Sequence, residues 1–223
     1  MNTLKLYNYF RSSTSYRVRI ALELKKLTYE YIPIHLLNNG GEQNSDDFRK
    51  INPMGGVPTL IHDDQSPLAQ SSAILEYLDE AFPQSYQLMP KDLLIRAKIR
   101  EFCQIINSEM HPYGNLKTTQ YLENNFKITT EEKIKWLHHW FNLGFSALEK
   151  ILEKNSQKYC FQNEITAADI YLIPHAVSAL RFEFDVSKYQ NINRICKTCQ
   201  EIESFRVAHP FRQIDTPDDL RII

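Results

Sequence analysis

The hydrophobic pattern of this sequence changes near residue 90, and this change limits the folds that the chain can adopt. Residues up to about 85 alternate short β-rich segments with short helical ones, whereas the later apolar residues recur at helical spacing. A chain of 223 residues is long enough for two small domains that share an interface. We therefore expect an α/β domain over residues 1–84 and an all-helical domain over residues 90–223, joined by a linker near residues 85–93.

The first of these segments predicts the order strand, helix, strand, short helix, strand, strand, helix. The expected strands are residues 4–9, 29–34, 57–61 and 67–69. The expected helices are residues 17–26, a short helix capped by Ser45, and a helix from Ser71 that ends before Pro83. A β-α-β opening with a mixed sheet is typical of an α/β domain. Proline is tolerated at the start of a strand, and a cis Val57–Pro58 bond would leave the amide and carbonyl of Val57 facing an open groove.

The later segment carries two helix-start signals. Thr129 is followed three residues later by Glu132, and Thr166 by Asp169, which are capping boxes or close variants of one. Apolar residues at helical spacing, such as Ile99, Phe102 and Ile106, precede the first of them. The sequence therefore predicts several packed helices in this half of the chain.

Bulk properties exclude several classes of function. The formal net charge is -1, so the chain lacks the basic field that attracts nucleic acid. No apolar run approaches the roughly 18 residues of a membrane span, and the N-terminus does not resemble a secretory signal. We therefore expect a cytoplasmic protein without membrane or nucleic-acid partners.

Two pairs of potential ligand residues are interpreted as structural. His138 and His139 lack the spacing of a helical metal site, so no metal is expected. Cys196 and Cys199 lie in an expected helix interior, which favours buried structural thiols over a redox pair.

A long motif covers the turn between the first strand and the first helix. Residues 10–22, FRSSTSYRVRIAL, closely resemble the zeta-class glutathione transferase signature S-S-C-x-[aromatic]-R-V-R-I-A-L. The segment NPMGGVPTL at residues 52–60, the pair Gln70–Ser71, and TAAD at residues 166–169 fall where this family has matching segments. The resemblance implies a thioredoxin-like N-terminal domain, an all-α C-terminal domain, and a homodimer.

The resemblance also implies a reaction and a set of catalytic residues. Members of the class isomerise maleylacetoacetate to fumarylacetoacetate in tyrosine and phenylalanine breakdown, with glutathione as a recycled cofactor whose thiolate is the nucleophile. The hydroxyl groups of residues 12–15, at the expected N-terminus of a helix, can stabilise such a thiolate. Ser12 is the first choice for the hydroxyl that stabilises it, followed by Ser13. Thr14 stands where the family has cysteine. These hydroxyl groups could instead only cap the helix, although one residue would suffice for that.

Further residues are implied to bind glutathione or the substrate. Cofactor contacts are expected at positions in both domains, namely Ser12, Ser13, Thr14, Ser15, Tyr16, Arg17, Gln43, Val57, Gln70, Ser71, His111, Asn115, Leu116 and Lys117. Gln70 and Ser71 would hold the γ-glutamyl carboxylate and amine, and Val57 would pair through its main chain. The substrate is a diacid, so Arg11 and Arg181 are expected to bind its carboxylates, with Arg11 also near the chemistry. Either Arg17 or Arg19 could hold a structural salt bridge instead.

Two other hypotheses stay open. The same parts would serve a related glutathione enzyme, such as a maleylpyruvate isomerase, a dehalogenase of α-halo acids, or a transferase that conjugates electrophiles. A non-catalytic transferase-like module that binds a partner is the third hypothesis, but such modules typically lose the residues that stabilise the thiolate, which are present here.

Overall fold

A mixed four-stranded sheet forms around the first strand, as the alternating residues 4–9 predict. The computed structural model describes residues 3–222, and its sheet has the order β2-β1-β3-β4. The strands are β1 (Leu4–Asn8), β2 (Tyr29–Pro33), β3 (Thr59–His62) and β4 (Leu68–Ala69). β1 is parallel to β2, with Leu4 opposite Tyr29, and antiparallel to β3, with Leu4 opposite His62. The parallel pair confirms the β-α-β opening, and the antiparallel β3–β4 pair confirms the hairpin.

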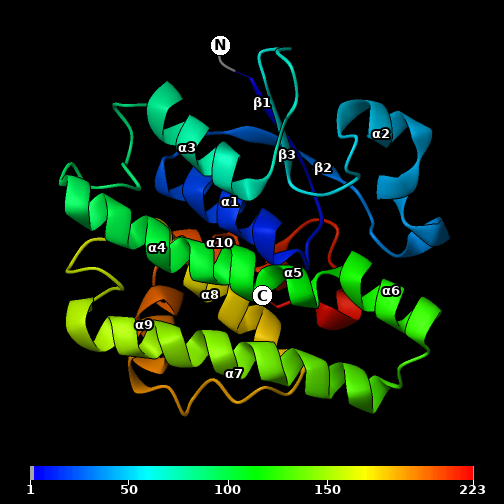
Figure 1. Cartoon of the computed structure of the whole chain (residues 1–223). Helices are drawn as coiled ribbons and strands as arrows, with labels where there is room; N and C mark the ends of the chain where they lie inside the picture. Colours follow the sequence, from blue (N-terminus) through cyan, green and yellow to red (C-terminus); the bar gives the residue numbers. More distant parts are fainter. Residues whose placement is uncertain (1–2, 223) are drawn as a thin grey trace. The chain divides into compact units, whose positions relative to one another are not determined.

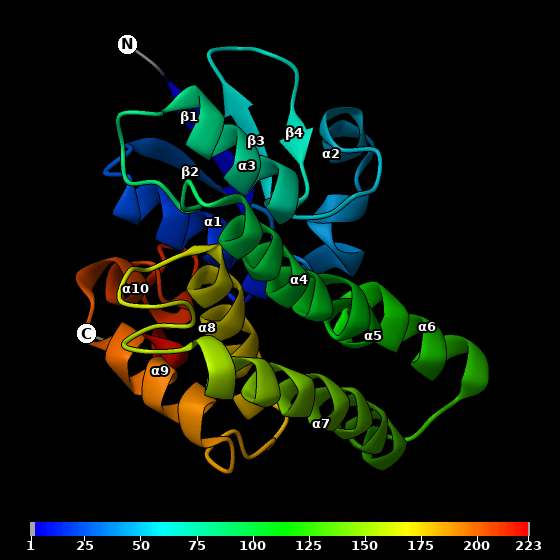
Figure 2. The same ribbon diagram turned by 60° about the vertical axis from the view of Figure 1, so that its left-hand side comes forward.

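Helices cover both faces of this sheet (Figures 1 and 2). On one side α1 (Ser13–Leu24) packs against α3 (Ser71–Ala81), and on the other lies α2 (Asp46–Ile51), where the ring of Phe48 contacts that of Tyr7 in β1. Two 3-10 turns, η1 (Asn38–Gly40) and η2 (Glu42–Asn44), precede α2. The first helix begins at Ser13, earlier than the expected residue 17, because Ser12 caps it.

The named elements of the second compact unit, residues 89–200, are all helices. Its helices are α4 (Leu93–Glu109), α5 (His111–Gly114), α6 (Leu116–Phe126), α7 (Thr130–Asn155), α8 (Ala167–Leu180) and α9 (Gln190–Gln200). α8 is buried from Ala167 to Ala176 and packs against α4 and α9. Both predicted capping boxes are present, at Thr129–Glu132 and Thr166–Asp169.

The end of the chain packs with the first unit rather than with the helices that precede it. Residues from Glu201 onward, including α10 (Glu203–Val207) and the 3-10 turns η3 (Pro210–Arg212) and η4 (Asp218–Leu220), cluster with residues up to Leu88. The hydroxyl of Tyr16 donates to the carbonyl of Phe205 at 2.8 Å, and Nε of Arg19 donates to that of Ala208 at 3.0 Å. The compact units therefore differ from the expected boundaries, because side chains of α1 hold the tail.

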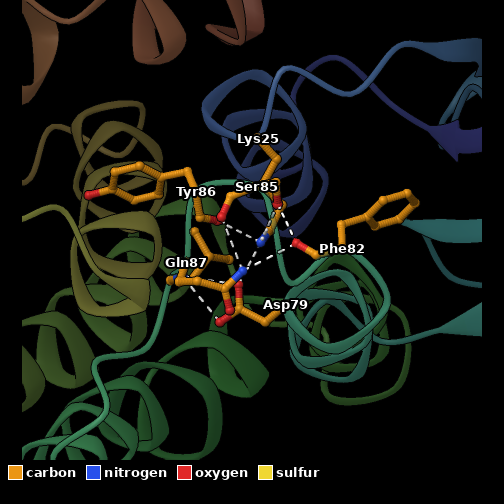
Figure 3. A network of polar contacts seen from close by, with 7 residues as sticks. Lys25, Asp79, Phe82, Ser85, Tyr86 and Gln87 are labelled. Carbon is orange, nitrogen blue, oxygen red and sulfur yellow. Dashed lines mark hydrogen bonds and ion pairs between the residues drawn. The ribbon is translucent and has the colours of Figure 1, made fainter.

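A buried ion pair fixes the segment that follows α3 (Figure 3). Lys25, at the C-terminal cap of α1, has a fully buried side chain whose Nζ lies 2.6 Å from Oδ1 of Asp79. The same Nζ donates to the hydroxyl of Ser85 at 3.3 Å and to the carbonyl of Tyr86 at 2.7 Å. Because all three ammonium hydrogens have acceptors, the charge is compensated inside the unit.

Candidate active site

Ser12 lies at the turn between β1 and α1 and caps the helix. Its amide donates to the carbonyl of Tyr9 at 3.0 Å, and its Oγ accepts the amide of Ser15 at 3.1 Å. The side chain is half-buried and stands at the positive end of the helix dipole. A hydroxyl at this place can stabilise a negative charge brought next to it, so the capping role and the predicted catalytic role coexist in one residue.

Thr14 connects Ser12 to the loop that carries Val57. Its Oγ1 lies 2.9 Å from Oγ of Ser12 and donates to the carbonyl of Val57 at 3.1 Å. A hydroxyl has one hydrogen, so Ser12 is the donor in its bond with Thr14. The carbonyl of Val57 was expected to face an open groove, and this is corrected in one respect: Thr14 already occupies one of its two acceptor positions.

The loop before β3 has the predicted backbone geometry. The Val57–Pro58 peptide bond is cis. Asn52 supports the loop, because its Nδ2 donates to the carbonyl of Gly56 at 2.8 Å and to the hydroxyl of Thr59 at 3.1 Å. The main chain of Val57 is thereby held at a defined place beside Thr14.

Ser71 and Arg17 meet at the N-terminus of α3. Gln70 is the N-terminal cap residue, exposed and with φ 71°, and Ser71 is the first residue of the helix rather than its cap. Nη1 of Arg17 donates to Oγ of Ser71 at 3.2 Å, and the Arg17 side chain is fully buried. A guanidinium beside a helix N-terminus forms a positive environment suited to a carboxylate.

Six of the predicted ligand contacts are buried, namely Ser13, Ser15, Tyr16, Arg17, Gln43 and Ser71. Tyr16 is 1% exposed and its hydroxyl donates to the carbonyl of Phe205, and Ser15 is 0% exposed. The amide of Ser15 donates to Oγ of Ser12, and the roles predicted for Ser15 and Tyr16 in ligand binding stay predictions. Gln43 is also buried, and its Nε2 donates to the carbonyl of Leu36 at 3.3 Å. Ser13 is buried as the first residue of α1, whereas Arg11 is half-buried next to Ser12.

The other predicted residues belong to the second unit. Asn115 caps α6, with its Oδ1 accepting the amide of Lys117 at 3.0 Å, and its Nδ2 lies 3.3 Å from Nε2 of His111. Leu116 and Lys117 are the first two residues of α6. Arg181 is exposed at the C-terminal cap of α8, with its guanidinium over the ring of Phe182. Roles for these five residues in ligand binding stay predictions.

Comparison with known proteins identifies the family. The model of the glutathione S-transferase N-terminal domain matches residues 2–80, and that of a glutathione S-transferase C-terminal domain matches residues 115–206. The maleylacetoacetate isomerase of Rattus norvegicus is 43% identical over 216 residues, which are 97% of this chain and 96% of the relative. That of Dictyostelium discoideum is 42% identical and covers 96% of each chain.

This chain belongs to the glutathione S-transferase family. The solved structures agree and point to its Zeta class. The holo structure of maleyl pyruvate isomerase, a bacterial Zeta-class glutathione S-transferase, has a TM-score of 0.91 at 36% identity and covers 96% of this chain and 100% of its own. A maleylacetoacetate isomerase from Methylobacterium extorquens with bound malonate and glutathione has the same TM-score at 33% identity, with 96% and 99% coverage. The predicted fold of a thioredoxin-like domain followed by a helical domain is confirmed.

Other conspicuous groups in this transferase are structural. Burial raises the pKa of Cys196 to about 12 and that of Cys160 well above its usual value, so these thiols stay protonated. Cys196 and Cys199 lie within α9 and are not disulfide-bonded, as expected. Within residues 3–222, no cluster of His, Cys, Asp or Glu could hold a metal ion, and no helix has the length and apolar character that crossing a bilayer requires.

Sequence reasoning missed the side chains of Arg19 and Asp215, which hydrogen-bond to the backbone that leads into Ser12. Arg19 was a candidate for a salt bridge, and it donates hydrogen bonds to the carbonyls of Tyr9, Phe10 and Ala208 and to the amide oxygen of Asn8. Asp215, in the tail, accepts the amide of Phe10. Local sequence patterns give no signal for the role of Asp215, because its partner lies 205 residues away.

Proposed function

We propose that this transferase catalyses the glutathione-dependent isomerisation of maleylacetoacetate to fumarylacetoacetate. The observation that carries the proposal is Ser12, a half-buried hydroxyl that caps α1 and is linked through Thr14 to the main chain of Val57. Relatives named maleylacetoacetate isomerase, about 40% identical over nearly the full chain, support this substrate.

The first unit has groups that fit glutathione. Gln70, Ser71 and the buried guanidinium of Arg17 would hold the γ-glutamyl end, because a helix N-terminus and a cation together favour its carboxylate. The main chain of Val57 would pair with the cysteinyl part, although its carbonyl would then be shared with Thr14. Gln43, whose Nε2 donates to the carbonyl of Leu36, is proposed to contact glutathione as well. Solved relatives carry glutathione in their active sites, which supports the same cofactor here.

The residues predicted to act in this reaction are proposed to have separate tasks. Bound glutathione would supply a thiolate nucleophile for reversible addition to the cis double bond of the substrate. The hydroxyl of Ser12 donates a hydrogen bond to that sulfur, and the N-terminus of α1 adds positive potential, so both lower the thiol pKa. Arg11 and Arg181 are proposed to bind the two carboxylates of the substrate, and His111, Asn115, Leu116 and Lys117 to approach the ligand from the helical unit.

A second candidate function keeps the same chemistry with another substrate. The solved relative named maleyl pyruvate isomerase, at a TM-score of 0.91, favours maleylpyruvate as the first alternative. Dehalogenation of α-halo acids and conjugation of electrophiles are the next alternatives. A non-catalytic binding module ranks last, because Ser12, Val57 and Ser71 supply the groups that glutathione binding and thiolate stabilisation require.

We also propose that the enzyme is a cytoplasmic homodimer in tyrosine and phenylalanine catabolism. The family resemblance and the names of the relatives support this. Sedimentation equilibrium would refute the dimer by returning the mass of one chain, and cell fractionation would refute the location by finding the protein outside the cytosolic fraction.

The test of the function is a coupled assay with maleylacetoacetate, glutathione and a fumarylacetoacetate hydrolase. We expect turnover that requires glutathione and that falls about a hundredfold or more in Ser12→Ala, because the variant loses a hydrogen bond to the developing thiolate. Maleylpyruvate is assayed in parallel. If the protein binds glutathione but turns over only maleylpyruvate, the first substrate is wrong and the second candidate replaces it.

A further inference from the structure

Two distant parts of the chain hold the backbone that leads into Ser12. The amide of Phe10 donates to Oδ2 of Asp215 at 3.0 Å, and the carbonyl of Phe10 accepts Nη2 of Arg19 at 3.0 Å. The carbonyl of Tyr9 accepts Nη1 of Arg19 at 3.3 Å and the amide of Ser12 at 3.0 Å. The main chain on both sides of Phe10 is therefore fixed by charged side chains, two residues before the proposed thiolate-stabilising hydroxyl.

Arg19 is fixed independently of this contact. It is fully buried in α1, and it also donates to the carbonyl of Ala208 at 3.0 Å and to Oδ1 of Asn8 at 2.9 Å. Its guanidinium thus joins the end of β1, the turn and the tail. Bonds from a charged donor are stronger than neutral ones, and a buried guanidinium with several carbonyl acceptors is a stable anchor.

Asp215 is also held on its other side. Its Oδ1 accepts the hydroxyl of Tyr31 in β2, and burial together with this bond raises the pKa of Tyr31, so the hydroxyl stays a donor. The neighbouring Thr216 donates to the carbonyl of Pro210 at 2.8 Å, which closes the tail on itself. The carboxylate of Asp215 therefore connects β2 to the Phe10 amide in a fixed geometry.

We propose that Asp215, acting with Arg19 through the backbone of Phe10, is a positioning residue for Ser12. The C-terminal tail thereby sets the place of the hydroxyl relative to the end of α1. Neither Asp215 nor Arg19 is proposed to touch the cofactor or the substrate. This inference rests on the proposed role of Ser12. It assigns the positioning of that hydroxyl to Asp215, a residue more than 200 positions away in the sequence.

A tail contact with a purely structural role would lower stability without changing the chemistry at Ser12. The test must therefore measure a property of the glutathione sulfur itself. We would measure the pKa of the glutathione thiol in the binary complex from its thiolate absorbance, together with the dissociation constant of glutathione and hydrogen exchange of the Phe10 amide in the ligand-free protein. The variant is Asp215→Asn, which keeps the shape but can accept only one of the two donors, and the matched control is Asp219→Asn, an exposed carboxyl in η4 of the same tail.

In Asp215→Asn we expect faster exchange of the Phe10 amide, a bound-thiol pKa raised by about one unit, and turnover at neutral pH lowered about tenfold. The dissociation constant of glutathione should change less than about threefold, because Arg17 and Ser71 are untouched. Asp219→Asn should change none of these values. If Asp215→Asn fails to fold, Tyr31→Phe removes only the hydroxyl that orients the carboxylate, and the same shifts are expected at a smaller size.

Ser12→Ala separates this inference from the proposed function. If Ser12→Ala raises the bound-thiol pKa while folded Asp215→Asn leaves it unchanged, the positioning role is overturned and the proposed function stands. If the effects of Asp215→Asn and Ser12→Ala on the thiol pKa add fully in the double variant, Asp215 does not act through Ser12 and the proposal is overturned. If Ser12→Ala leaves the thiol pKa unchanged, the role of Ser12 fails first and this inference fails with it.

Discussion

At the scale of single residues, a chain of hydrogen-bonded hydroxyl groups decides how readily Ser12 can donate a hydrogen bond to a thiolate. Ser12 donates to Thr14, Thr14 donates to Val57, and Ser12 accepts the amide of Ser15. In this arrangement the single hydrogen of Ser12 is used in the bond to Thr14, so the hydroxyl would have to turn to donate to a bound thiolate. Thr14 therefore competes with the thiolate for the single hydrogen of Ser12.

Thr14→Val tests this competition, because valine matches the shape of threonine but offers no acceptor. We expect the bound-thiol pKa to fall by a few tenths of a unit to about one unit, the worth of one net hydrogen bond. Thr14→Ser keeps the hydroxyl and is the control. Titration of the thiolate absorbance in the binary complex is the measurement, and a raised pKa in Thr14→Val would show that Thr14 assists the thiolate instead of competing with it.

At the scale of elements, the same helix-start motif occurs in two environments. In α7 Glu132 closes its capping box at an exposed site, with its carboxylate accepting the amide of Thr129 at 2.7 Å. In α8 Asp169 is 0% exposed, and it accepts the amides of Thr166 at 2.9 Å and Cys160 at 2.8 Å. The buried box thus also ties the loop at Cys160 to the helix, which the sequence pattern does not reveal.

The two boxes should differ strongly in their effect on stability. Asp169→Asn is expected to lower the free energy of unfolding by about 2–4 kcal/mol, because one buried amide loses a charge-assisted acceptor and the new amide group faces donors. Glu132→Gln is the matched control at an exposed box and should leave the midpoint of urea unfolding nearly unchanged. Similar midpoint shifts in both variants would contradict the assignment of the difference to burial.

At the scale of the whole molecule, the tail makes the first unit discontinuous in sequence. His209 lies in this tail with its ring against that of Tyr16, and its pKa is lowered to about 4 by burial and by the nearby charges of Arg19 and Arg212. A lowered pKa means that the folded state keeps this ring neutral where the unfolded state protonates it. The stability of the tail packing is therefore linked to pH.

Between pH 6.5 and about pH 4 the unfolded chain binds a proton at His209 that the folded chain does not. Stability is therefore fully present above this window and falls as the pH drops through it, by about 1 kcal/mol once solvent screening of the partly exposed ring is allowed for. His209→Asn keeps an acceptor for the amide of Phe211 but cannot titrate. Urea unfolding across the window should show a smaller pH dependence in the variant, and an equal slope would refute the assignment.

The local sequence determined the elements and the family of this protein. Strand alternation, the serine cap of α1 and both capping boxes are short-range signals, because each depends on hydrogen bonds or side-chain spacing within a few residues. The motif at residues 10–22 likewise predicted the transferase family before any contact was known. The interior positions of Ser15 and Tyr16 were not predicted, since a motif does not state which of its residues face inward.

Only the tertiary structure decided the contacts that join distant residues. It brought Thr14 to the carbonyl of Val57, Arg17 to Ser71, and Asp215 to the amide of Phe10. Such contacts form because buried polar groups must find partners inside the folded chain, whatever their separation in sequence. Sequence thus determined which groups could stabilise a thiolate, and the fold determined which other groups hold them in place.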